Sequence, residues 1–217
     1  MKASDKKRVI EFYDRKVAEH GYSPDTLGWN KRRHELRYDV LVTHWDLTGR
    51  RVLDFGCGFG DMYGYMRKRG IAAQYEGIDI NDNVLAEGRR VYPDATLVCR
   101  DAFADGLPAT YDYVLSSGVH NFRLENNEAF IKDSFELFNA ASRCGFALNF
   151  ISDRVGYRED HLNYTDPSMV LSLAYDYSNR VTLRNDYMPW EFTLFVDKRT
   201  DFDPDKGVYP DFADLVP

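Results

Sequence analysis

Apolar side chains recur at helical spacing in two segments near the start of the chain. Val9, Tyr13 and Val17 follow one another at i, i+4 spacing, and Leu36 and Val40 repeat it further along. This spacing places the side chains on one face of an α-helix. The pattern predicts two amphipathic helices within residues 1–48.

From residue 52 onward, short apolar runs alternate with helical segments. Strands are predicted at 52–55, 74–80, 95–100, 111–117 and 144–151, and helices at about 60–70, at 82–91, within 126–141 and within 167–176. Strands that alternate with helices in this way form a mostly parallel sheet with helices on both faces. The pattern therefore indicates an α/β fold.

The end of the chain follows a different pattern. Segments 180–188 and 190–198 read as two strands joined by little beyond Pro189. So short a link does not allow a parallel crossover, and we expect an antiparallel pair at one edge of the sheet. Residues 199–217 show no period and predict an extended tail.

Composition and charge restrict the classes of function. The 217 residues are 44% hydrophobic and 29% charged, and the formal net charge of -7 argues against a nucleic-acid or anionic-membrane partner. The charged N-terminal segment lacks the apolar core of a signal peptide or a membrane-spanning helix, so a cytoplasmic protein is expected. The three cysteines, which have no CxxC motif and no histidine at ligand spacing, predict neither a disulfide framework nor a zinc site.

A glycine-rich turn directly follows the strand at 52–55. The stretch VLDFGCGFGD places Gly56, Gly58 and Gly60 at alternate positions. Ligands of doubly wound sheets bind at such strand ends, and glycine removes the Cβ that would keep a ligand from the main chain. The spacing is G-x-G-x-G, whereas the dinucleotide fingerprint is G-x-G-x-x-G. Asp54 would be unfavourable beside a pyrophosphate and suits an ammonium group; a merely tight turn is the alternative.

Acidic residues also end the next two predicted strands. Asp79 ends QYEGIDI, where a carboxylate can accept hydrogen bonds from ribose hydroxyls, and Ile80 is placed to lie against a flat base. Asp101 and Ala102 follow the next strand and are placed to meet the edge of the base. Taken singly, each acid also reads as a helix cap or a solvated loop residue. Their common register at successive strand ends favours one nucleoside-binding edge.

The motifs VLDFGCGFGD, YEGIDIN, CRDAF and YDYVLSSG resemble the successive motifs of the class I S-adenosylmethionine-dependent methyltransferases. The resemblance covers most of residues 30–198. It implies a Rossmann-like, doubly wound, seven-stranded sheet in the order 3-2-1-4-5-7-6 with the last strand antiparallel and a helical cover at the N-terminus. It also implies S-adenosylmethionine as cofactor, S-adenosylhomocysteine as product, and no metal.

The resemblance assigns parts of the cofactor to residues. The turn beside Asp54 would receive the methionine part, Asp79 the ribose, and Ile80 the adenine ring. Ser117 and Gly118 would pass under the methionine end. Arg37 could pair with the cofactor carboxylate, or lie solvated at the surface. The complete expected cofactor-binding set is Arg37, Asp54, Gly56, Cys57, Gly58, Gly60, Asp79, Ile80, Asp101, Ala102, Ser117 and Gly118.

The acceptor is expected beyond the fourth strand. Methyl transfer from a sulfonium needs positioning and, for a nucleophile that carries a proton, a base. His120 is the predicted base and Asn121 the predicted orienting amide; a hydrogen bond from His120 to a loop carbonyl is the alternative. His44, on an apolar helix face, reads as a core histidine. The segment SSGVHNF lacks the Asn/Asp-Pro-Pro-Tyr/Phe motif of amino-directed nucleic-acid and protein-glutamine methyltransferases, and those substrate classes lose support.

Aromatic and polar residues outside the strands are expected to cover the acceptor. Tyr13 and Tyr22 are predicted to present aromatic faces to the sulfonium as part of a lid. The segment after the fifth strand predicts a polar acceptor site, with an ordinary charged loop as the alternative. Its polar residues are Asp153, Arg154, Tyr157, Arg158 and His161.

These observations lead to one hypothesis and two alternatives. The chain is interpreted as a single domain (1–217), with a lid at 1–48, a cofactor-binding sheet at 49–198 and a tail at 199–217. The hypothesis is methyl transfer to oxygen or nitrogen of a small polar metabolite, sugar-linked or otherwise specialised, by a monomer or homodimer. The alternatives are an NAD-dependent oxidoreductase and a catalytically silent partner protein that keeps the cofactor fold.

Overall fold

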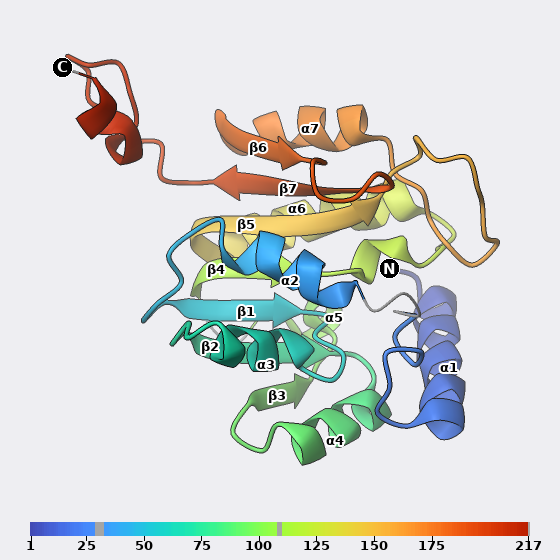
Figure 1. The fold of residues 1–217 in the computed structure, drawn as a ribbon. Coiled ribbons are helices and arrows are strands. Elements are labelled where there is room, and N and C mark those ends of the chain that lie inside the picture. Colours follow the sequence, from blue (N-terminus) through green and yellow to red (C-terminus); the bar gives the residue numbers. More distant parts are fainter. Residues whose placement is uncertain (29–32, 108–109, 217) are drawn as a thin grey trace.

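The computed structural model describes residues 1–28, 33–107 and 110–216, and its centre is a seven-stranded sheet (Figure 1). The strands are β1 (Arg51–Phe55), β2 (Gln74–Asp79), β3 (Thr96–Cys99), β4 (Tyr111–Ser116), β5 (Ser142–Ile151), β6 (Arg180–Arg184) and β7 (Glu191–Asp197). Their order is β3-β2-β1-β4-β5-β7-β6. β7 runs antiparallel to both neighbours and the other pairs are parallel. The predicted fold class, strand order and antiparallel edge are confirmed.

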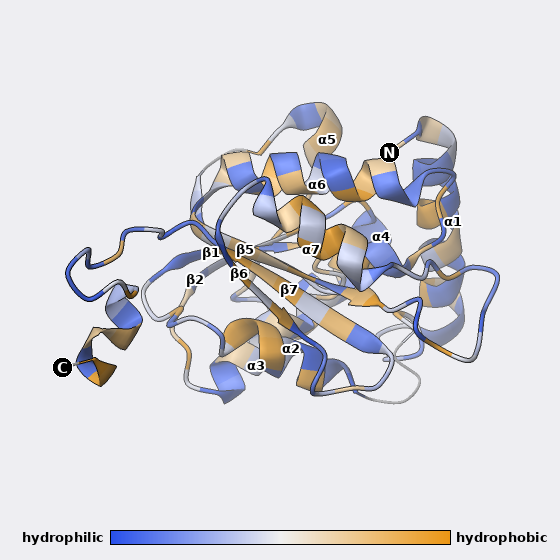
Figure 2. Cartoon of the chain, turned by 90° about the horizontal axis from the view of Figure 1, so that it is seen from above, coloured by the Kyte–Doolittle hydropathy of each residue, from blue (hydrophilic) through white to orange (hydrophobic). Residues whose placement is uncertain are grey.

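Helices cover both faces of the sheet. They are α1 (Ala3–His20), α2 (His34–Val42), α3 (Asp61–Lys68), α4 (Asp82–Val91), α5 (Ala102–Asp105), α6 (Asn127–Ala141) and α7 (Pro167–Tyr175), with short 3-10 turns η1 (Val119–Asn121) and η2 (Pro210–Leu215). α2 and α3 pack on one face, and α6 and α7 on the other (Figure 2). Because both faces are covered, every residue of β7 is buried and the strand reads as a nearly continuous apolar run.

α1 crosses the edge where the parallel strands end (Figure 1). Lys6 donates to Asp101, after β3, at 2.8 Å, and Asp14 accepts from the side chain of Asn81, after β2, at 2.9 Å. Asp5 accepts the backbone N–H of Glu125, ahead of α6, at 3.1 Å. Since these contacts lie at the start and in the middle of the helix, α1 forms a cover over this edge.

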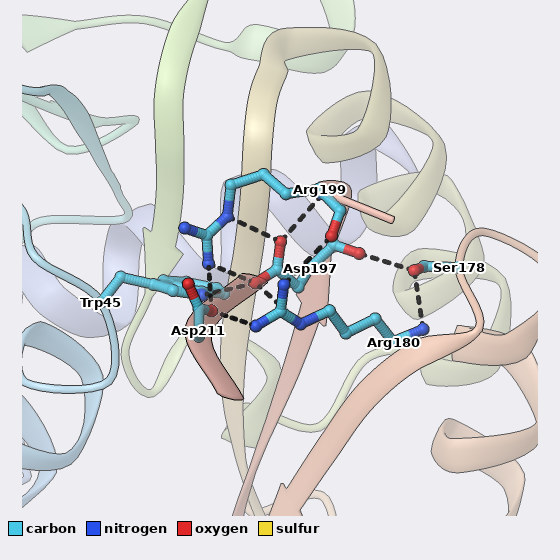
Figure 3. Close-up of polar contacts among 6 residues, drawn as sticks. All are labelled: Trp45, Ser178, Arg180, Asp197, Arg199 and Asp211. Carbon is cyan, nitrogen blue, oxygen red and sulfur yellow. Dashed lines mark hydrogen bonds and ion pairs between the residues drawn. The ribbon is translucent and has the colours of Figure 1, made fainter. Parts of the chain in front are cut away.

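A buried polar cluster organises the opposite edge of the sheet (Figure 3). Asp197, at the end of β7, is 4% exposed and accepts hydrogen bonds from the Trp45 indole at 3.2 Å and from the Arg199 guanidinium. Arg180, from β6, lies 3.5 Å from the same carboxylate and also pairs with Asp211. The cluster ties the last two strands to the segment that follows them.

The C-terminal segment departs from the predicted extended tail. Asp203 and Val208 form an isolated antiparallel bridge, and η2 follows it away from the main body (Figure 1). Asp211 of η2 pairs with Arg180 of β6, and this contact holds η2 in place. Because the two residues are far apart in the sequence, no local pattern predicts the contact.

Candidate functional site

A cavity of about 670 Å³ lies between the carboxyl edge of the sheet and α1. The turn after β1, the residues after β2 and β3, and the segment after β4 form its floor and walls, and α1 contributes Phe12 and Tyr13. Its volume falls in the range of pockets that hold small molecules and cofactors.

In the described part of the chain, no helix has the length and apolar character needed to cross a membrane.

The glycine turn forms one wall of this cavity. Gly56 and Gly58 have φ values of 70° and 56°, in the left-handed region that side chains disfavour. A Cβ on Gly56 would lie 2.1 Å from Cγ2 of Val119, so this turn also needs glycine for packing inside the protein. Gly60, with φ 83°, begins α3 and is not part of the cavity wall, so its predicted cofactor contact does not follow from its position.

Asp79 faces the cavity at the end of β2. Its two carboxylate oxygens accept the backbone N–H groups of Gly58 at 3.0 Å and Asn81 at 2.9 Å. Burial raises the pKa of Asp79, although these N–H groups oppose the rise. A carboxylate has about four acceptor positions, so two N–H donors leave capacity for ligand hydroxyls. Ile80 and Tyr13 line the cavity as well, and burial together with the charge of Asp79 raises the pKa of Tyr13 to about 12.

Asp54 is a buried carboxyl group beside the glycine turn. It is 2% exposed, lines the cavity and accepts the Tyr75 hydroxyl at 2.7 Å. Its pKa is raised to about 7: burial is the main cause, the charge of Asp79 adds to it, and the Tyr75 hydrogen bond opposes both. Burying a carboxylate is unfavourable unless a cation or donors compensate it. The chemistry of this position therefore suits an ammonium group.

Asp101, after β3, already has hydrogen-bond partners within the protein. Asp101 caps α5 by accepting the N–H groups of Phe103 and Ala104, and its second oxygen binds Lys6. Burial raises the pKa of Asp101, but Lys6 and the two N–H groups outweigh this effect and lower it. Asp101 and Ala102 do line the cavity. Cys57 lines it too, and burial raises the pKa of its thiol well above the usual value.

His120 does not occupy the position expected of a base. It is fully buried outside the cavity wall, between the rings of Phe130 and Phe150. Ser134 donates its only hydroxyl proton to the backbone carbonyl of Phe130. Its Oγ therefore accepts the hydrogen bond from Nε2 of His120, at 3.0 Å. Burial lowers the pKa of His120 to about 3, and the ring is neutral at physiological pH. This environment argues against the expected catalytic role and favours packing against α6.

Asn121, the neighbour of His120, does line the cavity. Its Oδ1 accepts the N–H of Ile151 at 2.9 Å, which fixes the side chain. Its Nδ2 has no hydrogen-bond partner among the described residues. Gly118 also lines the cavity and donates its N–H to Asn149 at 2.7 Å, and Ser117 contributes a buried hydroxyl. The segment after β4 thus offers donors to a ligand.

Arg37 lines the cavity but is engaged by a residue distant in sequence. Its guanidinium forms a two-fold hydrogen-bonded ion pair with Glu191, at the start of β7. Both side chains are largely buried, at 11% and 1% exposure. The prediction that Arg37 serves the cofactor carboxylate did not include this partner, because residues 154 apart in sequence give no local signal.

The residues predicted to cover the acceptor divide into two groups. Tyr13 and Tyr157 line the cavity. Tyr22 instead donates to Asp61 at 2.8 Å and packs on Phe59, outside the cavity wall. Arg154 is also outside the wall, and is an exposed partner of the adjacent Asp153. The structure therefore does not place Tyr22 and Arg154 at the acceptor, since one is held by α3 and the other faces solvent.

Sequence analysis missed several residues of the cavity wall. They are Phe122, Glu159, Trp190 and Glu191. His161, which belongs to the segment predicted to form a polar acceptor site, also lines the cavity. His44, predicted as a core histidine, stacks on Phe195 with ring centroids 3.8 Å apart, and burial lowers its pKa to about 4. Its position supports that interpretation.

The comparisons with known proteins identify the family of this chain. Residues 52–140 match a family model described as a methyltransferase domain. A Mycobacterium tuberculosis protein named as methyltransferase Rv1506c is 35% identical over 161 residues, which cover 68% of this chain and 92% of that protein. The chain belongs to the class I S-adenosylmethionine-dependent methyltransferases. A ubiquinone biosynthesis O-methyltransferase of Burkholderia ambifaria is 32% identical over 101 residues, 44% of this chain and 38% of that enzyme.

Solved structures share the fold at low sequence identity. Magnesium protoporphyrin IX methyltransferase from Synechocystis PCC 6803, with bound S-adenosylhomocysteine, has a TM-score of 0.64 at 15% identity and covers 89% of this chain and 99% of its own. The DhpI-SAM-HEP complex has a TM-score of 0.67 at 13% identity, covering 90% of this chain and 98% of its own. The cofactor of this chain is S-adenosylmethionine, and the buried acid, the glycine turn and Asp79 form a donor and acceptor set that fits it.

Proposed function

We propose that this enzyme transfers a methyl group to oxygen or nitrogen of a small polar metabolite, sugar-linked or otherwise specialised. The observation that carries the proposal is the shared cavity: Asp54 and Asp79 line the same space as Asn121 and the Arg37–Glu191 pair. When bound, the cofactor supplies the methyl group as an electrophile. An acceptor in the same cavity would be held by the polar groups opposite the two acids.

We assign roles to the residues by their chemistry. Asp79 accepts the ribose hydroxyls, Asp54 binds the ammonium group, and Ile80 contacts the adenine ring. Asn121 orients the acceptor through Nδ2, because its Oδ1 is already used by the main chain. Nδ2 faces the cavity side of the residue with its two N–H donors unused by the described residues, so a ligand acceptor atom can bind there.

The surroundings of the cavity favour a small acceptor. α1 covers the cavity and is attached to the sheet at both halves of its length, by Lys6 and by Asp14. The net charge of -7 gives little attraction for a polyanion. The alternatives weighed from the sequence lose support, since the family uses S-adenosylmethionine and the turn lacks the dinucleotide spacing.

The experiment has two parts. Titration calorimetry with S-adenosylhomocysteine and with NAD tests the cofactor, and only the first is expected to bind. Labelled S-adenosylmethionine is then incubated with catechol, methyl glucoside, glycerate and ethanolamine, and methylated product is detected by mass spectrometry. Turnover of a hydroxyl or amine probe supports the proposal. Cofactor binding without turnover of any probe contradicts the proposed acceptor class.

A further inference from the structure

Two segments distant in sequence pair at the acceptor end of the cavity. Phe122 and Leu162 form an antiparallel bridge. On either side of it, Arg123 donates its N–H to the carbonyl of His161 at 2.8 Å, and Asn163 donates to the carbonyl of Asn121 at 2.9 Å. The loop after β5 is thereby fixed against the segment after β4, and His161 is held next to the residues that line the cavity.

The imidazole of His161 lies where three elements meet. It stacks on Phe12 of α1, with ring centroids 5.8 Å apart and planes at 25°, and Phe12 in turn packs edge-on against Phe122 at 5.3 Å. Nε2 of His161 lies 3.8 Å from Oε2 of Glu159. Both side chains line the cavity and remain about half exposed, so the ring can exchange protons with solvent.

The other described histidines are less suited to act on the acceptor. His120 is buried and neutral. His34 packs on Tyr38 and His44 on Phe195, and neither histidine is part of the cavity wall. His20 lines the cavity, but it lies further along α1 than Phe12, by about 12 Å at the helical rise of 1.5 Å per residue.

From this geometry we propose that His161 is the general base of the transfer and that Glu159 positions it. The proposal rests on the proposed function, an acceptor that carries a proton on oxygen or nitrogen. As the acceptor atom forms its bond to the methyl carbon, the sulfur–carbon bond breaks and its electron pair stays on sulfur. The acceptor's proton passes to Nδ1 of His161, because Glu159 faces Nε2. The half-exposed imidazolium then releases the proton to water.

Charged groups of both signs lie around the ring. Glu159 and Asp160 are on the same segment as His161, Arg123 donates its guanidinium to the carbonyl of Asp160 at 3.2 Å, and Arg8 of α1 lies over the Phe122 ring. Glu159 is the carboxylate closest to the imidazole, and its position beside Nε2 allows it to orient the ring. Hydrogen bonds of catalytic groups are often long before substrate binds and shorten in the complex.

The test uses the full chain and whichever of the probes catechol, methyl glucoside, glycerate or ethanolamine the wild type methylates fastest. His161→Gln is expected to lower kcat by about 10²- to 10⁴-fold, the usual contribution of general base catalysis, with unchanged affinity for S-adenosylhomocysteine. The rise of kcat with pH should be lost, because the base acts only in its unprotonated form. Glu159→Gln should give a smaller loss and move the pH profile. Glu128→Gln, at an exposed acid of α6 outside the cavity wall, is the control and should behave as the wild type.

Chemical rescue separates the base from a structural role. Added imidazole should restore part of kcat in His161→Gly and have no effect on the wild type. A His161→Gln variant that keeps wild-type kcat and pH profile would overturn the proposal while leaving the proposed function intact. Wild-type protein that binds the cofactor but methylates none of the probes would contradict the proposed function, and the base with it.

Discussion

The carboxylate of Asp79 accepts a hydrogen bond from the backbone N–H of Gly58 at 3.0 Å. The contact joins the glycine turn after β1 to the end of β2, and the second oxygen of Asp79 joins it to Asn81 at the start of α4. Two neighbouring βα turns are thus fixed to each other before any ligand is bound. This preorganises the wall of the cavity that we assign to the ribose.

Replacing the Asp79 carboxylate should weaken cofactor binding. In Asp79→Asn the side chain loses its charge, and one of its two acceptor oxygens is replaced by an NH₂ group. The backbone N–H of either Gly58 or Asn81 would then face another donor. We expect the Kd for S-adenosylhomocysteine to rise by about 10- to 100-fold, equivalent to the loss of a charged hydrogen bond. Calorimetry measures this. Asp82→Asn, a nearby exposed acid paired with Arg89, is the control; an unchanged Kd in Asp79→Asn would remove this residue from the site.

Much of the fold and of the cofactor edge was readable because its signals are local. The strands, the glycine turn and the acids at the strand ends lie within short stretches such as VLDFGCGFGD, and the parallel order of the strands brings these stretches to one edge. The predicted elements agree with the observed ones to within a few residues, apart from the short helix α5 and the turns of the tail.

The acceptor side was less readable because long-range contacts set it. His120 is buried by Phe130 and Ser134 of α6, and nothing in the sequence around His120 shows which helix covers it. Glu191 reaches Arg37 only because β7 inserts between β5 and β6. His161 reaches the cavity through the Phe122–Leu162 bridge. Each of these three contacts joins segments that are far apart in the sequence. Hydrophobic periodicity predicts single helices and strands, but it does not show which of them come into contact.

The pKa of Asp54 should make stability depend on pH. Burial raises this pKa from 3.8 to about 7, against the opposing Tyr75 hydrogen bond. Between these values the folded protein keeps a proton that the unfolded chain has released, so this carboxyl lowers the free energy of unfolding as pH rises from 4 to 7. Asp54→Asn should remove that dependence and be more stable than the wild type at pH 8, by about 4 kcal/mol at most.

Urea unfolding at pH 5 and pH 8 measures the effect. Asp46→Asn is the control, because hydrogen bonds from Thr48 lower the pKa of Asp46 and its removal should give no gain at high pH. Cofactor affinity should show the opposite trend: S-adenosylhomocysteine should bind the wild type more tightly as Asp54 ionises, and Asp54→Asn should bind weakly at every pH. Equal pH dependence of stability in the wild type and Asp54→Asn would contradict the raised pKa.

Gly56 should tolerate alanine less well than another glycine of similar backbone conformation. Gly56 and Gly49 have φ values of 70° and 72°, so alanine at either position bears about 1–2 kcal/mol of left-handed strain. Only at Gly56 does the added Cβ meet another atom, Cγ2 of Val119 at 2.1 Å, whereas Gly49 has nothing within 4 Å. We expect Gly56→Ala to lose clearly more stability in urea and to lose cofactor binding. Similar losses in both variants would mean that backbone strain alone accounts for the effect.

Asn81 should control how firmly α1 covers the cavity. Its side chain donates to the carbonyl of Ile10 at 3.2 Å and to Asp14 at 2.9 Å, while its Oδ1 caps α4 by accepting the N–H of Val84. Asn81→Ser keeps a capping oxygen and removes both contacts to α1. We therefore expect faster hydrogen exchange in the α1 amides and faster release of S-adenosylhomocysteine, with the protection of α4 nearly unchanged.

The matched control for this prediction is Asn126→Ser. Asn126 caps α6 in the same way, by accepting the N–H of Ala129 at 2.9 Å, but it is exposed and none of its hydrogen bonds reaches α1. Because serine and asparagine are similarly good N-caps, this variant should leave exchange in α1 and cofactor release at wild-type values. If Asn81→Ser also leaves α1 protected, the remaining contacts are sufficient to hold the cover and Asn81 serves only as a helix cap. These contacts include Lys6 with Asp101, Asp5 with Glu125, and Asp14 with Asn83.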